Sequence, residues 1–116
     1  MPENACANTH HESVELPPTV GAICLARAAR MLSAAGDPAR LGLLELLDSR
    51  ELCVTDIATL TGDSMPAVSQ RLRVLKAEGL VRSRRDGKHI FYALADDHVR
   101  DLVANVLRHA AESPSR

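Results

Sequence analysis

Four segments in the first two thirds of the chain place apolar residues three or four positions apart, which is the spacing that aligns one face of an α-helix. They cover residues 20–36, 38–49, 55–61 and 64–78. Residues that start or stop helices separate these segments. They are Gly36, Asp37, Pro38, Gly62, Ser64 and Gly79. The pattern therefore predicts four helices in succession, the third of them short.

The hydrophobic period changes after Gly79. The segment 80–94, LVRSRRDGKHIFYAL, has β-prone residues on both sides of Asp86-Gly87, which predicts a β-hairpin with its turn at these two residues. Residues 96–112, DDHVRDLVANVLRHAAE, return to helical spacing. A short helix, a glycine turn, a second helix and a hairpin make a winged helix-turn-helix, with the element order ααααββα.

The length and composition indicate one small, mainly helical domain. The chain has 116 residues, 46% of them hydrophobic and 2% aromatic, so its core is expected to consist of aliphatic side chains. Residues 1–18 have little apolar content and end in Pro17-Pro18, which predicts a flexible arm before a domain over 19–116. No apolar segment is long enough to span a membrane and no secretion signal is visible, so we expect a cytoplasmic protein.

The charge of the chain is unevenly distributed. The net charge is −1, but residues 64–92 hold seven Lys or Arg against two acids, a net +5, which leaves −6 for the remainder. A basic surface on an acidic body is typical of a local DNA-binding element. The alternative is a basic surface that is merely solvated.

The fourth predicted helix has a buried stripe and a polar face. Val68, Leu72 and Leu75 form the stripe. Ser69, Gln70 and Arg73 lie on the polar face, where they are expected to contact base edges in the major groove. Basic residues around the hairpin tip are expected near phosphates or an adjacent minor groove. The predicted DNA-contacting residues are Ser64, Ser69, Gln70, Arg73, Arg84, Arg85 and Lys88.

From about residue 19 to 112 the chain resembles the ArsR/SmtB family of metal-responsive winged-helix repressors. The resemblance rests on GDPARLGLLELL, ELCVTDIA, AVSQRLRVLKAEGLV, DGKHIFYAL and the terminal DDHVRDLVANVLRHAAE. It implies a homodimer built from the first and last helices, which represses genes by binding operator DNA, an imperfect inverted repeat, and leaves it when metal binds. One departure is Asp63, where the family usually has an apolar residue.

Polar pairs at the two ends of the terminal helix predict a metal site between subunits. His98 and His109 are eleven residues apart and so share a face, but they are separated by roughly 16 Å. If two helices pair antiparallel, Asp96 and His98 of one subunit meet His109 and Glu112 of the other, which gives two four-ligand sites per dimer. These residues also match the zinc-sensor pattern of the family. Alternatively, Asp96 is an N-cap, His109 a helix-dipole partner and Glu112 a solvated acid.

A second metal site is implied by related sensors, in which the third helix and the partner's arm supply ligands. It would take Cys53 and Asp56 from the helix, and Cys6 with His10 or His11 from the arm. Alternatively, Cys53 is a small core residue and Asp56 a first-turn acid.

The expected effector is Zn²⁺, which Co²⁺, Cd²⁺ or Ni²⁺ could replace in vitro. Thr55 stands where family members tuned to thiophilic ions have a second cysteine, and the loss of that soft ligand favours zinc. A sensor of a softer metal (Cd, Pb, Cu or As) that uses Cys6 and Cys53 is the alternative.

Two other classes compete with a repressor of metal efflux or sequestration genes. A zinc hydrolase needs an open coordination position, which four protein ligands would not leave, so we expect no enzyme activity. A zinc-binding scaffold without DNA binding is disfavoured by the +5 segment.

Overall fold

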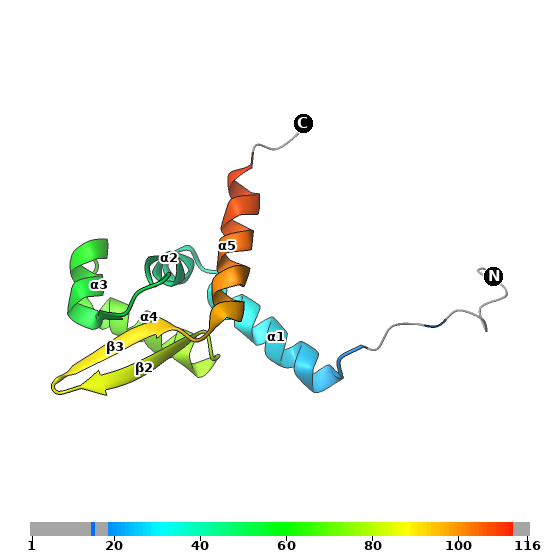
Figure 1. Ribbon diagram of the computed structural model, residues 1–116, viewed down its shortest axis with the longest axis horizontal. Coiled ribbons are helices and arrows are strands. Elements are labelled where there is room, and N and C mark those ends of the chain that lie inside the picture. The colour runs from blue at the N-terminus through cyan, green and yellow to red at the C-terminus, as the bar shows by residue number, and fades with distance from the viewer. Residues whose placement is uncertain (1–14, 16–18, 113–116) are drawn as a thin grey trace.

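The computed structural model describes residue 15 and residues 19–112. In this part of the chain the elements form a winged helix-turn-helix, as predicted (Figure 1). The helices and strands are α1 (Ala22–Ala35), α2 (Pro38–Leu46), β1 (Leu52–Cys53), α3 (Val54–Thr61), α4 (Met65–Ala77), β2 (Val81–Asp86), β3 (His89–Leu94) and α5 (Asp97–Ala111). None of these helices is both long and apolar enough to cross a membrane.

Side chains just before three helices explain where those helices begin. Asp37 accepts a hydrogen bond from the backbone N–H of Arg40, and Ser64 accepts one from Ala67. Asp96 caps α5 in the same way. Each bond satisfies a backbone donor that has no partner within the first helical turn. The predicted caps at Asp37 and Ser64 are confirmed.

Two predicted boundaries were wrong. The second helix ends at Leu46 instead of continuing to Ser49, because the chain turns over the next three residues and Ser49 adopts a left-handed φ of 62°. The hairpin turn consists of Gly87 and Lys88, not Asp86-Gly87, because Asp86 pairs with His89 as the last rung of the ladder. Gly87 is at the first turn position with φ 63°, a conformation that glycine adopts without strain.

A third strand, which the sequence did not predict, extends the hairpin to an antiparallel sheet of order β1-β3-β2. Leu52 pairs with Tyr92 and Cys53 with Phe91. This strand is only two residues long, so it shows no alternation that a pattern could reveal. It attaches the start of α3 to the wing.

The core lies between α2, α3, α4 and the sheet. Its most deeply buried side chains are aliphatic, as the composition predicts. They are Leu44, Leu47, Ile57, Val68, Leu72, Leu75 and Leu80. The helix α5 contributes Val99 and Val103, whereas α1 contributes only Ala34.

The first and last helices leave apolar side chains in solvent. On and beside α1, large apolar residues are more than half exposed, and α5 exposes two more. They are Val20, Ile23, Leu25 and Leu32 near α1, and Leu102 and Val106 on α5. Figure 1 shows that α1 and α5 lie at the end of the molecule opposite the hairpin tip. Exposed apolar faces of this kind mark surfaces for association.

Candidate nucleic-acid interface and metal sites

The helix α4 has the two faces that the sequence predicts. Val68, Leu72 and Leu75 are buried against the core, whereas Gln70 and Arg73 are exposed. Arg73 Nη1 donates a hydrogen bond to Gln70 Oε1 at 2.5 Å, so these two side chains form one polar unit on the outer face. A guanidinium and an amide can both contact the edges of bases in a major groove.

Ser64 and Ser69 have different surroundings. Ser64 is exposed and occupied in capping α4. Ser69 is half-buried and lines a hollow between α4 and the wing, together with Tyr92 of β3. Ser69 therefore faces the gap between helix and hairpin.

Asp63, the departure from the family pattern, forms an ion pair at the turn of the helix-turn-helix. Its Oδ2 atom lies 2.9 Å from Nη1 of Arg71, and its backbone N–H donates to Thr61 Oγ1. Asp63 is exposed, so it does not occupy a core position that an apolar side chain would fill. The ion pair ties the turn to α4.

The two faces of the hairpin point to different neighbours. Side chains alternate along a strand, so Ser83 and Arg85 share the face of the buried Val81, while Arg82 and Arg84 lie on the other face. Lys76 Nζ of α4 donates to Ser83 Oγ at 2.8 Å, which shows that the first of these faces is turned towards α4. Arg85 is therefore on the α4 side of the wing.

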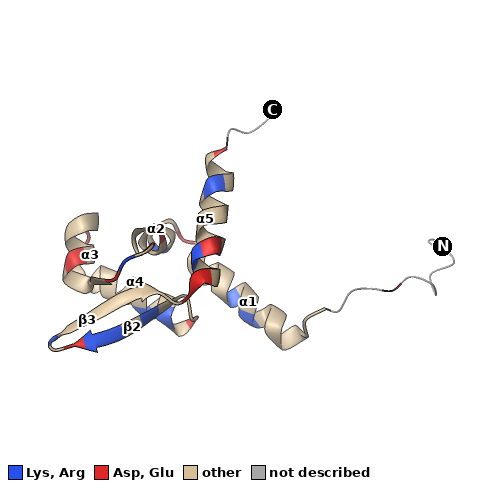
Figure 2. Ribbon diagram, viewed as in Figure 1, with Lys and Arg blue, Asp and Glu red and all other residues tan. Residues whose placement is uncertain are grey.

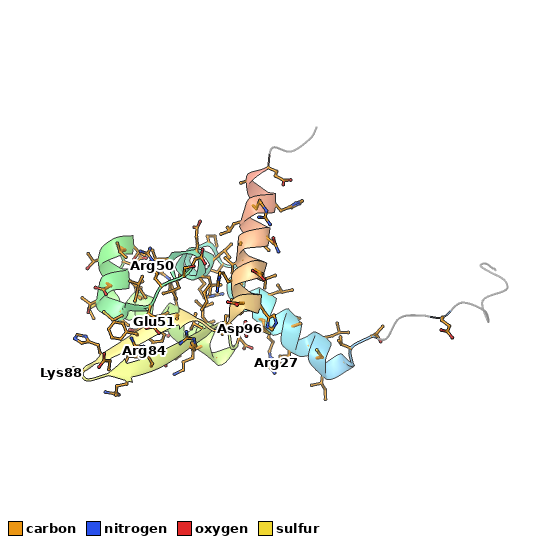
Figure 3. The ribbon with its side chains drawn as sticks, viewed as in Figure 1. Arg27, Arg50, Glu51, Arg84, Lys88 and Asp96 are labelled. Carbon is orange, nitrogen blue, oxygen red and sulfur yellow. The ribbon has the colours of Figure 1, made fainter. Side chains whose placement is uncertain are left out.

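Arg84 is held by Glu51, which the sequence analysis missed. Its Nε and Nη2 atoms lie 2.8 and 2.7 Å from Glu51 Oε1, and its guanidinium carbon lies 4.9 Å from the centroid of the Phe91 ring. Arg82 Nη1 is 3.6 Å from Glu51 Oε2. Figure 3 shows Glu51 and Arg84 close together, with Lys88 farther out at the hairpin tip.

This contact shifts the pKa of both partners in the direction that favours their charged forms. The hydrogen bond from Arg84 lowers the pKa of Glu51, and the same bond raises the pKa of Arg84. Glu51 directly precedes β1, and because that strand was not predicted, nothing in the sequence indicated that Glu51 would meet a residue 33 positions later.

Figure 2 shows basic residues along β2 and acidic residues at the start of α5.

The terminal-helix residues form two pairs in one chain. His98 Nδ1 lies 3.6 Å from Asp96 Oδ1, and His109 Nδ1 lies 3.9 Å from Glu112 Oε1. Both imidazoles are almost fully exposed. Asp96 also caps α5, so its alternative role is present as well. Within the described residues of a single chain, no three metal-ligating side chains come together.

The residues of the second predicted site are only partly described. Cys53 is half-buried at the junction of β1 and α3, and Asp56 is exposed in the first turn of α3. Cys6, His10 and His11 lie outside the described residues, as does nearly all of the predicted arm 1–18.

Comparison with known proteins identifies the family. Residues 37–83 match the family described as "Bacterial regulatory protein, arsR family". The cadmium resistance transcriptional regulatory protein CadC homolog of Staphylococcus aureus is 35% identical over 88 residues, which are 75% of this chain and 73% of that protein. The chain belongs to the ArsR family.

Other ArsR-family relatives and a solved structure agree with this assignment. The transcriptional repressor SmtB homolog of Synechocystis sp. is 45% identical over 85 residues, which are 73% of this chain but 64% of that protein, so the match spans less than two thirds of its length. The homodimeric winged helix-turn-helix DNA-binding domain Mb0332 of Mycobacterium bovis matches with a TM-score of 0.77 and 34% identity, over 88% of this chain and 94% of that one. The two curated relatives are named as transcriptional regulators and the solved structure as a DNA-binding domain, in agreement with the expectation of a non-enzyme.

Proposed function

We propose that this protein is a zinc-responsive transcriptional repressor. Its metal-free homodimer would bind operator DNA at an imperfect inverted repeat and release it when zinc binds, so that genes for metal efflux or sequestration are transcribed. The observation that carries the proposal is the layout of α5. An acid and an imidazole lie within 4 Å of each other at each end, and the exposed Leu102 and Val106 lie between the two pairs.

The donor chemistry of the two pairs fits zinc. Zn²⁺ takes imidazole nitrogen and carboxylate oxygen at about 2 Å, so ligands of one ion lie within roughly 4 Å of one another. Asp96 with His98, and His109 with Glu112, already meet this spacing in one chain. An antiparallel pair of α5 helices would bring the two kinds of pair together, and a twofold axis would make two equivalent sites.

Exposure supports a site shared between subunits. His98 and His109 are 97% and 89% exposed, so in the described part of the chain both imidazoles are accessible to a partner subunit. Bound there, zinc would crosslink the subunits. The crosslink would fix the angle between two α4 helices that must reach half-sites about 34 Å apart.

On the DNA side, we propose that α4 enters the major groove. Gln70 and Arg73 would contact base edges, and Ser64 and Ser69 would contact the backbone. Arg85 and Lys88 of the wing would approach phosphates or the neighbouring minor groove. We also propose a contact from Arg84, which must first exchange its ion pair with Glu51 for a phosphate.

A sensor of a softer metal is the second candidate, because the Staphylococcus aureus relative is named for cadmium resistance. Its ligands would be Cys53 and Asp56 with Cys6 and either His10 or His11. Cys53 is only half-buried, so its thiolate would be available at the start of α3. Operator release by cadmium at lower concentrations than zinc, lost in a Cys53→Ser variant, would favour this candidate over zinc.

Operator titration by fluorescence anisotropy, with and without zinc at matched salt, tests the proposal. Wild type should bind about 5- to 150-fold more weakly with zinc, the range for a coupling of 1–3 kcal/mol. In His98→Ala or His109→Ala the operator affinity should be the same with and without zinc, whereas Cys6→Ser should keep the wild-type difference. His89→Ala is the matched control, because it removes an exposed imidazole from the wing instead of α5. Equal wild-type affinity with and without zinc would refute the proposal.

A substitution on α4 separates DNA contact from metal binding. Arg73→Ala should lower operator affinity and leave the zinc stoichiometry unchanged, because the Arg73 side chain is exposed on α4, hydrogen-bonded to its helical neighbour Gln70 and far from the proposed ligands on α5. Full operator affinity of this variant would show that the recognition face has been placed wrongly.

A further inference from the structure

A hollow between α4 and the wing has a lining suited to an anion. It is lined by Ser69, Arg73, Lys76 and Ala77 of α4 and by Tyr92 of β3. These residues include two cations and two hydroxyl groups, and none of them is a carboxylate. The small side chain of Ala77 leaves room between the helix and the strand.

Lys76 is positioned in this hollow by the wing itself. It lies in the last turn of α4, and its Nζ atom donates to Ser83 Oγ of β2 at 2.8 Å. An ammonium group has three N–H donors, so this bond leaves two for a ligand. Two cations of β2 differ from Lys76 in this respect, because Arg82 and Arg84 lie on the opposite face of the hairpin and contact Glu51.

The path of DNA across the proposed interface passes this hollow. If α4 lies in a major groove and the wing approaches the adjacent minor groove, the sugar-phosphate backbone that separates these grooves must run between them. Residues near the N-terminus of a recognition helix contact bases, whereas Lys76 is at the C-terminal end. A lysine is also a point charge that suits a phosphate oxygen.

We propose that this hollow seats one phosphate of the DNA backbone, with Lys76 as its cation and Ser83 as the residue that positions Lys76. This inference rests on the proposed DNA binding and adds a specific contact to it. The bound phosphate would fix the register of α4 along the groove, and the wing and the helix would share that contact.

The test is the salt dependence of DNA affinity for Lys76→Met. The proposed dimer has two such hollows, and each neutralised phosphate contributes about 0.9 to the slope of log affinity against log salt. The variant should therefore have a slope lower by about 1.8. Its affinity relative to wild type should therefore recover by about 12-fold between 50 and 200 mM salt. Operator and unrelated DNA should lose affinity equally, because a phosphate contact carries no sequence information.

Arg82→Met is the matched control. It removes one charge from the same hairpin at a residue that takes no part in the proposed DNA contacts, and should leave the slope unchanged. In a second arm, neutral methylphosphonate replaces one DNA phosphate at a time. One position in each half-site should weaken binding by wild type and have no further effect on binding by Lys76→Met.

A purely structural role for Lys76 predicts other results. In that case the slope would stay at the wild-type value, Ser83→Ala would reproduce the full loss, and no methylphosphonate position would lose its effect in Lys76→Met. Any of these outcomes overturns the inference. Failure of the proposed operator binding is distinct from these outcomes, since wild type itself would then show no preference for operator over unrelated DNA.

Discussion

Replacing Leu102 and Val106 together by alanine should weaken the homodimer and leave the fold of each protomer intact. Both side chains lie on the outer face of α5 between His98 and His109, and they are 36% and 46% exposed in the single chain. Neither belongs to the buried core, which α5 joins through Val99 and Val103. Their truncation therefore acts mainly on the proposed subunit interface.

The magnitude follows from these exposed fractions. Complete burial of a leucine or valine side chain stabilises by about 1.5–3 kcal/mol, so burying what is still exposed should contribute about 1 kcal/mol per residue. A dimer has four such side chains, and alanine retains the Cβ atom of each. The double variant should lose about 2 to 3 kcal/mol of dimer stability, a roughly 30- to 140-fold rise in Kd.

Sedimentation equilibrium over a dilution series measures this change, with a chelator present so that no metal bridges the subunits. Leu60→Ala is the matched control, because Leu60 is 56% exposed on α3 and lies outside the proposed interface. The control should dimerise as wild type does. If the Kd of the double variant equals that of wild type, or if the Kd of the control rises as much as that of the double variant, then α5 does not form the dimer interface.

Two further predictions concern the wing and the start of α4. Glu51→Gln should free Arg84 and remove part of the acid sensitivity of folding. Because the pKa of Glu51 is lowered in the folded protein, its ion pair contributes to folding stability at pH values above the ordinary glutamate pKa of 4.5. This contribution is lost as the pH falls through the lower pKa of the folded state. Acid unfolding followed by circular dichroism measures the difference between the variant and wild type. Ser64→Ala should cost about 1 kcal/mol of stability in urea unfolding, since the cap on Ala67 is lost, and Ser64→Asp should retain most of it.

Local signals in the sequence predicted most of the fold. A cap such as Ser64 and a stop such as Gly62 act within one helical turn, so the few residues around each already determine the boundary. The stripe of Val68, Leu72 and Leu75 was equally predictable, because a helix of known period must turn these residues to one side. The pairs at each end of α5 are also local, three residues or fewer apart.

Features that depend on distant residues were not predictable. The strand β1 exists because Leu52 and Cys53 find a free edge on β3, about 40 positions later in the chain. The ion pair of Glu51 with Arg84 depends on that strand. The turn at Gly87-Lys88 was misplaced by one residue because the cross-strand register is set by packing along the whole hairpin, not by the turn residues alone.

The helix α5 has two apolar faces, and their arrangement explains why metal ligands there could act on DNA. Val99, Val103 and Leu107 pack against the core beside Leu44 and Leu94, whereas the stripe of Leu102 and Val106 is rotated by about 80° and faces solvent. The first face ties α5 to its own protomer, and the core together with the Lys76–Ser83 bond ties α4 and the wing to that same protomer. Each protomer of the proposed dimer then moves as one packed unit, so a change in the angle between two α5 helices must change the separation of the two α4 helices. Ligands at the ends of the exposed stripe would act at that joint, where a small rotation has its largest effect on the spacing of the recognition helices.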